Sequence, residues 1–572
     1  MARSGGSGLF LSRIGSMKKR LSTVLLSLML TLSVGLTGCG NAIDNKNATE
    51  SSEVAEAEAS DAYQLMEAVN PQDVAGVDDK YRNYYEIFPY SYCDSNGDGI
   101  GDLNGISSKL DYISDLGINA IWLTPICSSD TYHKYDVKDY YTIDPDFGTM
   151  EDFENLMSGC EDRGIDVIVD LVVNHTSTKN EWFRQAYLYI KSLDEGEEPD
   201  PAECPYVEYY NFSREYKSGW SQIADTEWYY EAQVWSEMPD LNLDNEAVRN
   251  EISDIVQFWL DKGVAGFRLD ATTSYYTGSD EKNVEFLSWL NGCVKEKKAD
   301  AYIVGECWSN NVTYSSYYAS GVDSFFDFDF ADKNGSIAKV LQGGNAVGFG
   351  NTLMTVQSAI QENNPEAIDA AFTSNHDTGR VSGYFAGDYS ENMTKMAQAV
   401  AMMMGGNYFL YYGDELGMKG SGDDENKRCP MQWSTDSSAE EMCDSVATKS
   451  VEMKYGSLEE QEADGNSIYY FVKEGLKLRN AYPEIARGTT SVEASVSDEN
   501  VLVLRKEYEG TELLIVMNLS EAEKTMDLSQ LSVNGKAVDD TCIAGMLITG
   551  DAAVSMEEST VTMPAYSVEL FR

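Results

Sequence analysis

Residues 165–175 read Ile-Asp-Val-Ile-Val-Asp-Leu-Val-Val-Asn-His. Up to Val173 this stretch is apolar and rich in β-branched residues apart from two aspartates, and polar Asn174 and His175 follow at once. A nearly continuous apolar strand is typical of a parallel sheet that helices cover on both faces. The stretch therefore predicts a buried parallel strand whose carboxyl end carries polar groups.

Other short apolar runs repeat this pattern between amphipathic helical segments, at residues 118–123, 266–270, 302–306, 372–374 and 408–411. Strands that alternate with helices over about 400 residues predict an α/β fold, the (β/α)8 TIM barrel. A doubly wound open sheet is the alternative. No Gly-rich dinucleotide-binding loop supports that alternative, so we favour the barrel.

Two regions interrupt the alternation. Residues 176–232, after the third strand, hold Trp, Tyr, Pro and Glu with little helical period, which predicts an inserted subdomain. Residues 485–572 contain short strands separated by turn residues, which predicts a C-terminal all-β sandwich. The catalytic barrel is then expected in residues 80–175 and 233–484.

The amino terminus predicts export. A basic start at residues 17–20 precedes an apolar run of signal-peptide length, which ends in Leu-Thr-Gly-Cys39. This ending resembles the lipobox of bacterial lipoproteins. Residues 17–39 are therefore expected to be a lipoprotein signal peptide, with a lipid on Cys39 that anchors the protein at the extracellular face of a bacterial membrane. A short anchor that is never cleaved is the alternative.

The segments that flank this signal are simpler. Residues 1–16 look like an upstream extension, with Met17 as the initiator, and the polar, acidic residues 40–79 predict a solvated tether. No later segment has eighteen consecutive apolar residues, so no other membrane span is expected.

Charge and cysteine content exclude two classes of protein. The chain has 42 Lys and Arg against 95 Asp and Glu, a net charge of −53, which argues against nucleic acid as a partner. Of its 10 cysteines, removing Cys39 leaves an odd number, so at least one free thiol or an intermolecular bridge is expected. The sequence contains no CxxC pair and no Cys/His cluster, so a zinc site is not expected.

Polar residues gather at the carboxyl ends of four predicted strands, where barrel enzymes carry their reactive groups. Arg268 and Asp270 are two residues apart and share one side of their strand, and Asp170 could pair with Arg268. A lone buried Asp–Arg pair is often only structural. Several carboxylates at one mouth, with Glu306 and Asp377 added, instead suit glycoside hydrolysis, which needs one carboxyl to protonate the leaving oxygen and another to attack or to activate water.

These segments, in order, resemble the motifs of the α-amylase family, the large (β/α)8 glycoside hydrolase family 13, across residues 80–572. The resemblance implies a retaining mechanism with Asp270 of GFRLD as nucleophile, Glu306 of IVGECW as general acid/base and Asp377 of SNHD as the carboxylate that stabilises the transition state. The residues that it implies around the cleaved glucose are Tyr135, as the stacking platform, with His133, His175, Arg268 and His376.

The resemblance also implies a metal. The loop Asp94-Ser-Asn-Gly-Asp-Gly-Ile-Gly-Asp102 begins like an EF-hand, but its twelfth position is Gly105 instead of Glu. It resembles the first-loop calcium site of some family members. The implied ligands of a structural Ca²⁺ are Asp94, Asn96, Asp98, the carbonyl of Ile100, and Asp102. A turn without metal is the alternative.

Three departures bear on specificity. The stretch that follows Asp270, Ala-Thr-Thr-Ser, lacks the Lys and His that many α-amylases carry there, so their interdomain calcium site is not expected. Met238-Pro-Asp-Leu-Asn242 resembles members intermediate between oligo-1,6-glucosidases and neopullulanases. Tyr132 stands where exo-acting oligo-1,6-glucosidase relatives carry an Asp that pairs with a distant Arg, and Ala271 where α-1,6-cleaving relatives tend to carry Val.

The resulting prediction is an endo-acting hydrolase of α-1,4 bonds in starch, maltodextrins and related α-glucans. An α-glucosidase or a neopullulanase-like enzyme of the same family is one alternative. A non-catalytic glucan-binding lipoprotein is the other, although such relatives have usually lost members of the three-carboxylate set that this chain retains.

Overall fold

The computed structural model describes residues 66, 68–71 and 79–572. The predicted signal peptide, and the predicted tether apart from those few residues, lie outside this description. Within the described ranges, no helix combines the length and the apolar character that a membrane crossing requires.

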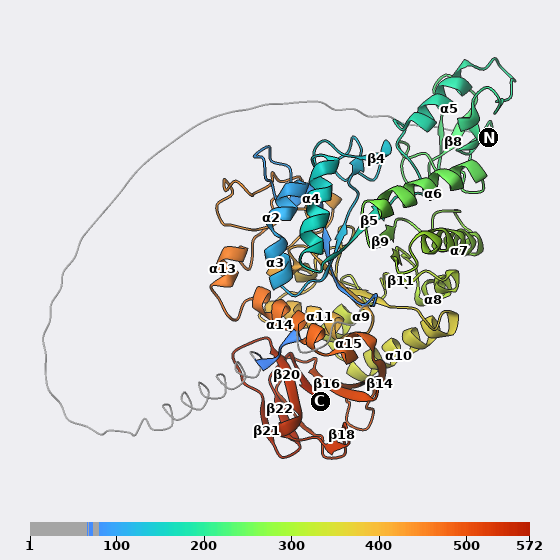
Figure 1. Ribbon diagram of the computed structural model, residues 1–572. Helices are drawn as coiled ribbons and strands as arrows, with labels where there is room; N and C mark the ends of the chain where they lie inside the picture. Colours follow the sequence, from blue (N-terminus) through green and yellow to red (C-terminus); the bar gives the residue numbers. More distant parts are fainter. Residues whose placement is uncertain (1–65, 67, 72–78) are drawn as a thin grey trace, which may run out of the picture. The chain divides into compact units, whose positions relative to one another are not determined.

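Eight parallel strands form one sheet that closes into a barrel (Figure 1). Their order is β11-β10-β9-β5-β2-β1-β13-β12, and a parallel bridge between Phe326 and Ala370 joins the two edges. The strands are β1 (Asn83–Ile87), β2 (Ala120–Leu123), β5 (Asp166–Leu171), β9 (Gly266–Leu269), β10 (Tyr302–Gly305), β11 (Ser324–Phe325), β12 (Ala370–Phe372) and β13 (Asn407–Tyr411). The predicted TIM barrel is confirmed.

Helices surround the barrel and leave its carboxyl-terminal mouth to the loops. They are α2 (Leu103–Ser108), α3 (Leu110–Asp115), α4 (Met150–Glu161), α6 (Glu246–Asp261), α7 (Asp280–Lys297), α8 (Asn311–Tyr317), α9 (Ser336–Gly343), α10 (Ala346–Asn363), α11 (Ser390–Met403), α12 (Asp424–Lys427), α13 (Leu458–Glu462), α14 (Ile468–Ala481) and α15 (Pro483–Arg487). A small hairpin, β3 (Cys127–Ser128) with β4 (Asp139–Ile143), follows β2.

Aromatic side chains fill the inside of the barrel. Tyr84 stacks on Phe409 with ring centroids 4.5 Å apart, and Trp122 stacks on Phe326 at 5.2 Å. Alternate residues of each strand point inward, so Ile168 packs in this cluster while Asp170, two residues later, reaches the mouth. The packed interior therefore forms the floor of any site at the mouth.

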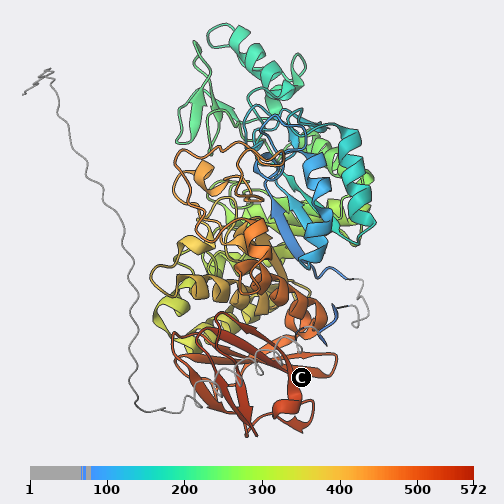
Figure 2. The same ribbon diagram turned by 90° about the vertical axis from the view of Figure 1, so that its left-hand side faces the viewer.

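The insertion after β5, here called domain B, carries helix α5 (Glu181–Ser192) and a three-stranded sheet ordered β6 (Phe212–Ser213), β8 (Tyr229–Glu231), β7 (Trp220–Gln222). The expectation of little helical period is wrong at α5. Its buried residues Phe183, Ala186 and Ile190 recur at helical spacing, and Asn180 caps its first turn. Figure 2 shows domain B projecting at the top, beyond the barrel.

The C-terminal region is all β and packs against α10, α14 and α15. Its main antiparallel sheet is ordered β14 (Thr489–Val492), β15 (Val501–Tyr508), β16 (Thr511–Asn518), β23 (Ser567–Phe571), β20 (Ile543–Ile548). Smaller sheets pair β17 (Lys524–Asp527), β22 (Thr560–Met563) and β21 (Ser555–Glu557), and β18 (Ser532–Val533) with β19 (Lys536–Ala537).

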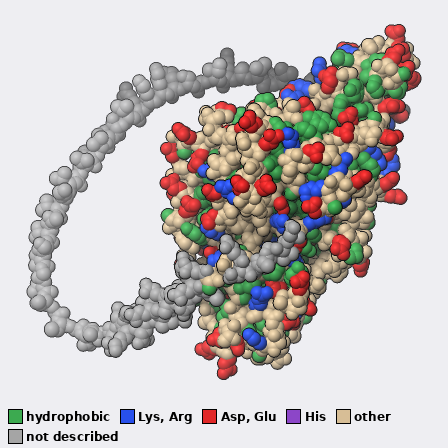
Figure 3. Space-filling view, in the orientation of Figure 1, with side chains coloured by type: hydrophobic (Ala, Val, Ile, Leu, Met, Phe, Trp, Pro, Cys, Tyr) green, Lys and Arg blue, Asp and Glu red, His purple; other side chains and the backbone are tan. Residues whose placement is uncertain are grey.

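Charged side chains of both signs lie on the surface. In Figure 3, Asp and Glu are spread over the visible face with Lys and Arg interspersed. This distribution agrees with the net charge of −53.

Candidate active site

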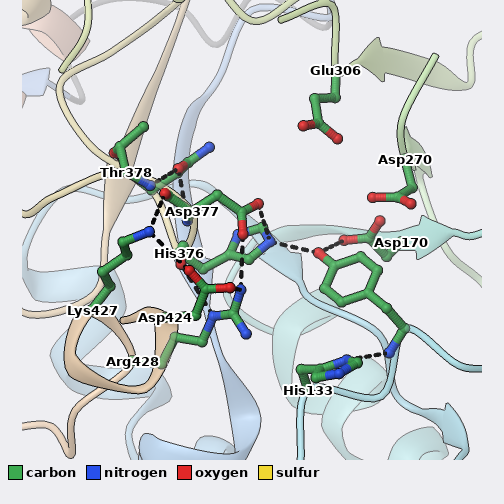
Figure 4. Close-up of polar contacts among 12 residues, drawn as sticks. His133, Asp170, Asp270, Glu306, His376, Asp377, Thr378, Asp424, Lys427 and Arg428 are labelled. Carbon is green, nitrogen blue, oxygen red and sulfur yellow. Dashed lines mark hydrogen bonds and ion pairs between the residues drawn. The ribbon is translucent and has the colours of Figure 1, made fainter. Parts of the chain in front are cut away.

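The polar side chains predicted at the strand ends meet at one mouth of the barrel. Asp170 lies in β5 and Arg268 in β9, Asp270 follows β9 directly, and Glu306 follows β10 directly. Asp377 lies in the loop after β12. In Figure 4, Asp270 and Glu306 lie on one side of the site and Asp377 on the other. A molecule at the mouth would therefore have carboxyl groups on two sides.

Arg268 connects three of these carboxyl groups. Its buried Nη1 donates to Asp170 Oδ1 at 2.8 Å and to Asp270 Oδ1 at 2.6 Å, and its Nη2 donates to Glu306 Oε2 at 2.7 Å. One rigid, planar guanidinium thus fixes the positions of both predicted catalytic carboxyls. The predicted pairing of Asp170 with Arg268 is confirmed.

Glu306 has the environment of a proton donor. Burial raises the pKa of its carboxyl to about 7, with Asp270 and Asp377 adding to the shift and Arg268 opposing it. The backbone N–H of Ala271 also donates to Glu306 Oε2, at 3.0 Å. Ala271 has φ 49°, a left-handed conformation rare for Ala, and this strained turn directs its N–H at Glu306.

Asp377 has the opposite environment. Burial alone would raise its pKa, but His376 and Arg428 hold the pKa well below the usual range. His376 Nε2 lies 2.9 Å from Asp377 Oδ2, and Arg428 Nη2 donates to Oδ1 at 2.8 Å. Burial would also lower the pKa of His376, yet Asp377 and Glu86 raise it to about 9. Asp377 is therefore an ionised acceptor when Glu306 can still be protonated.

Tyr135 closes one side of the cluster. Its hydroxyl lies 2.7 Å from His376 Nε2 and donates to Asp170 Oδ2 at 3.2 Å, and its ring stacks on His376. His133 holds the same loop, because its Nδ1 accepts from the Tyr135 N–H at 3.1 Å. Burial, then Arg428, lowers the pKa of His133 to about 4, so this ring is neutral near pH 7.

His175 lies where domain B joins the barrel. Its Nδ1 is 3.2 Å from Asn174 Nδ2, which also donates to Asp240 Oδ1 at 3.5 Å. Its buried Nε2 has no hydrogen-bond partner among the described residues, and burial lowers its pKa. Since Asn174 donates to Nδ1, the ring proton belongs on Nε2, which is then free to donate to a ligand.

Residues that the sequence reasoning missed complete the site. Glu86, at the end of β1, binds His376 Nδ1 at 2.6 Å. Arg428 also donates to the Tyr132 hydroxyl at 2.9 Å. Trp308 is 52% exposed, two residues after Glu306, and its ring stacks on Phe328 with centroids 4.5 Å apart. Trp308 is the last residue of the GECW motif, and it is the only one of these three residues that lies in a motif of the sequence.

The predicted calcium loop folds into successive side-chain turns. Asp94 Oδ1 accepts from the N–H groups of Asn96 and Gly97, Asn96 Oδ1 from that of Asp98, and Asp98 Oδ1 from that of Ile100. Asp102 instead binds Ser95 and caps α2. The described residues, this loop included, contain no group of three or more His, Cys, Asp or Glu side chains arranged to hold a metal ion.

All nine cysteines of the described residues are free thiols. Of the two predicted alternatives, a free thiol or an intermolecular bridge, the structure of the single chain shows free thiols.

Comparisons with known proteins agree with this geometry. A family model described as the catalytic domain of alpha amylase matches residues 86–488. Alpha-amylase 3 of Dictyoglomus thermophilum is 37% identical over 459 residues, which cover 78% of this chain and 87% of that protein. A probable oligo-1,6-glucosidase 3 of Bacillus subtilis is 30% identical, over 79% of this chain and 93% of that protein.

A solved structure is also similar. Eubacterium rectale Amy13B has 47% sequence identity and a TM-score of 0.86, covering 89% of this chain and 98% of that one. The similarity thus includes the domains that flank the barrel.

Proposed function

The chain belongs to the α-amylase family of glycoside hydrolases, and from this we propose that it cleaves α-1,4-glucosidic bonds within starch-like glucans with retention of configuration. The observation that carries the proposal is the shared guanidinium of Arg268, which holds Asp270 and Glu306 together while their surroundings differ. Retaining enzymes need such a closely spaced pair, with carboxyls about 5–5.5 Å apart.

The first chemical step uses both carboxyls. A lone pair of the Asp270 carboxylate attacks the anomeric carbon, the bond from that carbon to the glycosidic oxygen breaks, and the Glu306 proton moves to that oxygen. In the second step, Glu306 takes a proton from water while the water oxygen attacks the same carbon and displaces Asp270. Glu306 ends protonated and Asp270 ionised, so the cycle closes.

The neighbouring side chains bind the sugar. Asp377, held ionised by His376 and Arg428, can accept from two hydroxyls, and the free Nε2–H of His175 can donate to a third oxygen. Tyr135 presents its ring as an apolar face. The Trp308 ring is exposed two residues after Glu306, and we propose that it stacks on the departing sugar.

Endo action is proposed from position 132. Tyr132 offers Arg428 a hydroxyl acceptor, and its ring packs against Phe88 and Tyr90. A phenol has no carboxylate with which to grip a chain end, so longer glucans can extend past the cleaved glucose.

We expect soluble starch to lose iodine staining early, with maltose and longer oligomers before glucose. Tyr132→Asp should place a carboxylate beside Arg428 and shift the early products toward glucose. Glucose as the sole early product of the unmodified enzyme, or isomaltose cleaved faster than maltotriose, would instead favour an α-glucosidase. Chromatography of timed samples distinguishes these outcomes.

A structural Ca²⁺ is the second part of the proposal. The donor set of the Asp94–Asp102 loop is entirely oxygen, which suits this hard cation, and Asp94 and Asp102 are buried. A Cβ at Gly99 would lie 2.5 Å from Asp444 Oδ2, so a further carboxylate faces the loop. When bound, the ion would neutralise this charge and fix the first βα loop of the barrel.

Removal of the ion is expected to lower the Tm of the wild type, because a ligand that binds only the folded state stabilises it, by about 2.7 kcal/mol at 100 times Kd. Asp98→Ala should start at a lower Tm and respond little to chelator. Differential scanning calorimetry with and without chelator, then with added Ca²⁺, measures both. Equal Tm values for both proteins in chelator and in Ca²⁺ would mean a metal-free loop.

Export as a lipoprotein is the third part, and it rests on the sequence of residues 17–39. Cys39→Ala is expected to leave the precursor unprocessed or to release the protein from the membrane fraction, because no thiol remains to carry the lipid. Cell fractionation measures membrane association, and the mass of the protein shows whether the precursor is processed. Cys293→Ala, which removes a half-buried thiol of α7, is the control. Normal processing and membrane retention of Cys39→Ala would contradict the proposal.

A further inference from the structure

Domain B contains a groove of about 750 Å³ that shares no residue with the catalytic cluster. Aromatic rings, carboxylates and amides line it together. Its lining includes Asn211, Lys217, Trp220, Glu231, Glu208 and Asn242. A groove of this size is within the range of small-ligand sites.

The sheet of domain B sets three of these side chains in one row. Trp220 of β7 is the direct partner of Glu231 of β8, and the Glu231 N–H donates to the carbonyl of Asn211, just before β6. Directly opposed residues of antiparallel strands point to the same face, with Cβ atoms about 4.5–5.5 Å apart. An indole, a carboxylate and an amide thus stand next to one another on one surface.

The polar groups of this row are held in place. Glu231 Oε2 accepts from Asn211 Nδ2 at 2.9 Å, and Oε1 accepts from Gln233 Nε2 at 2.9 Å. Each carboxylate oxygen keeps a lone pair for a further donor. Lys217, an exposed residue, lies with its Nζ over one face of the Trp220 ring, 4.3 Å from the ring centroid, so a ligand would pack on the other face or displace this ammonium.

The charge of the groove restricts what it can bind. Glu231 and the exposed Glu208 repel anions, and the polar rim disfavours a purely apolar partner. A neutral ligand with many hydroxyl groups and flat C–H faces meets both restrictions. Its hydroxyls can donate hydrogen bonds to the carboxylates, and its C–H faces can pack on the indole ring. An α-linked glucan has this chemistry.

We propose that the face of domain B formed by Asn211, Trp220 and Glu231 is a second carbohydrate-binding site, which holds a segment of α-glucan away from the catalytic carboxyls. This inference rests on the proposed α-glucan substrate. The site would raise the local concentration of long chains near the catalytic mouth and would leave short substrates unaffected.

The test uses the full chain with Asp270→Asn, which binds glucan without consuming it, in native gels containing soluble starch. Adding Trp220→Ala is expected to weaken retention by starch at least threefold. Tyr216→Ala, which removes an exposed aromatic of the same domain outside the groove, should leave retention unchanged. Glu231→Gln leaves the Trp220 ring in place and should also weaken retention by starch. This second variant tests the site even if Trp220→Ala fails to fold.

With Asp270 intact, Trp220→Ala should raise KM for starch while kcat/KM for maltotriose stays within twofold of wild type. Retention of Trp220→Ala and Glu231→Gln equal to that of the parent would overturn the second site. A failure of the proposed function appears differently, since the wild-type enzyme would then not hydrolyse starch at all.

Discussion

Asp270→Asn is expected to lower kcat on maltodextrins by at least about 10⁴-fold, the scale seen when a covalent nucleophile is removed. The amide keeps the size of the carboxyl but cannot form the glycosyl ester, and it removes the anion that Arg268 Nη1 binds at 2.6 Å. Asp300→Asn, at an exposed acid that forms an ion pair with Lys298, should retain full activity. Initial rates of reducing-sugar release measure both variants.

A variant with a smaller side chain at position 270 tests whether Asp270 is the nucleophile. Asp270→Ala leaves space beside the anomeric carbon, so added azide can attack in place of the carboxylate. The expected product is a glycosyl azide of inverted configuration, formed from a substrate with a good leaving group. Nuclear magnetic resonance identifies the anomer. Retained activity of Asp270→Asn, or an azide product of retained configuration, would assign the nucleophile to another residue.

The sequence predicts the strands of the barrel where apolar runs are long. The observed first residue is within one position of the predicted one in four strands, β5, β9, β10 and β13, because their buried apolar runs are continuous. β1 was missed because Asn83 and Glu86 interrupt its pattern, and β11 because it has only two residues, Ser324 and Phe325. Both missed strands are essential to closure, which local sequence patterns do not specify.

The same limit applies to the site. Asp170, Asp270 and Glu306 could be predicted because they lie near or directly after the carboxyl ends of apolar strands, where a barrel gathers reactive groups. Glu86 binds His376 from 290 residues away in the sequence, and Arg428 binds Asp377 from 51 residues away. Such contacts depend on how the barrel closes and on where the short helix α12, which Arg428 directly follows, lies against the mouth. A single sequence shows neither.

The site has more buried acids than cations. Arg268 contacts Asp170, Asp270 and Glu306, while Arg428 and His376 contact Asp377. Asp377 has two cationic neighbours and stays ionised, whereas Glu306 shares one guanidinium with two other carboxylates. Since like charges compete for that cation, burial raises the pKa of Asp170 to about 6 and that of Glu306 to about 7. Of these two acids, Glu306 has the higher pKa and the side chain that is partly exposed at the mouth.

This asymmetry predicts the pH dependence of the reaction. Glu306 must be protonated to donate to the leaving oxygen, so activity is full below its pKa and falls above it. With a folded-state pKa of about 7, raised first by burial, kcat/KM on maltodextrins should fall tenfold per pH unit above about pH 7. Asp377, whose pKa is held low, should keep its charge throughout that range.

Glu306→Gln is expected to lower kcat/KM on maltodextrins by about 10²–10⁴-fold and to abolish the fall above pH 7. A 4-nitrophenyl glycoside should lose far less, because its leaving phenolate needs no proton. Glu285→Gln, an exposed residue of α7, serves as the control. Rates measured from pH 4 to pH 10 on both substrates separate the two roles of the residue. An alkaline fall that persists unchanged in Glu306→Gln would mean that another group donates the proton, and that the raised pKa of Glu306 only reflects its burial beside Asp270.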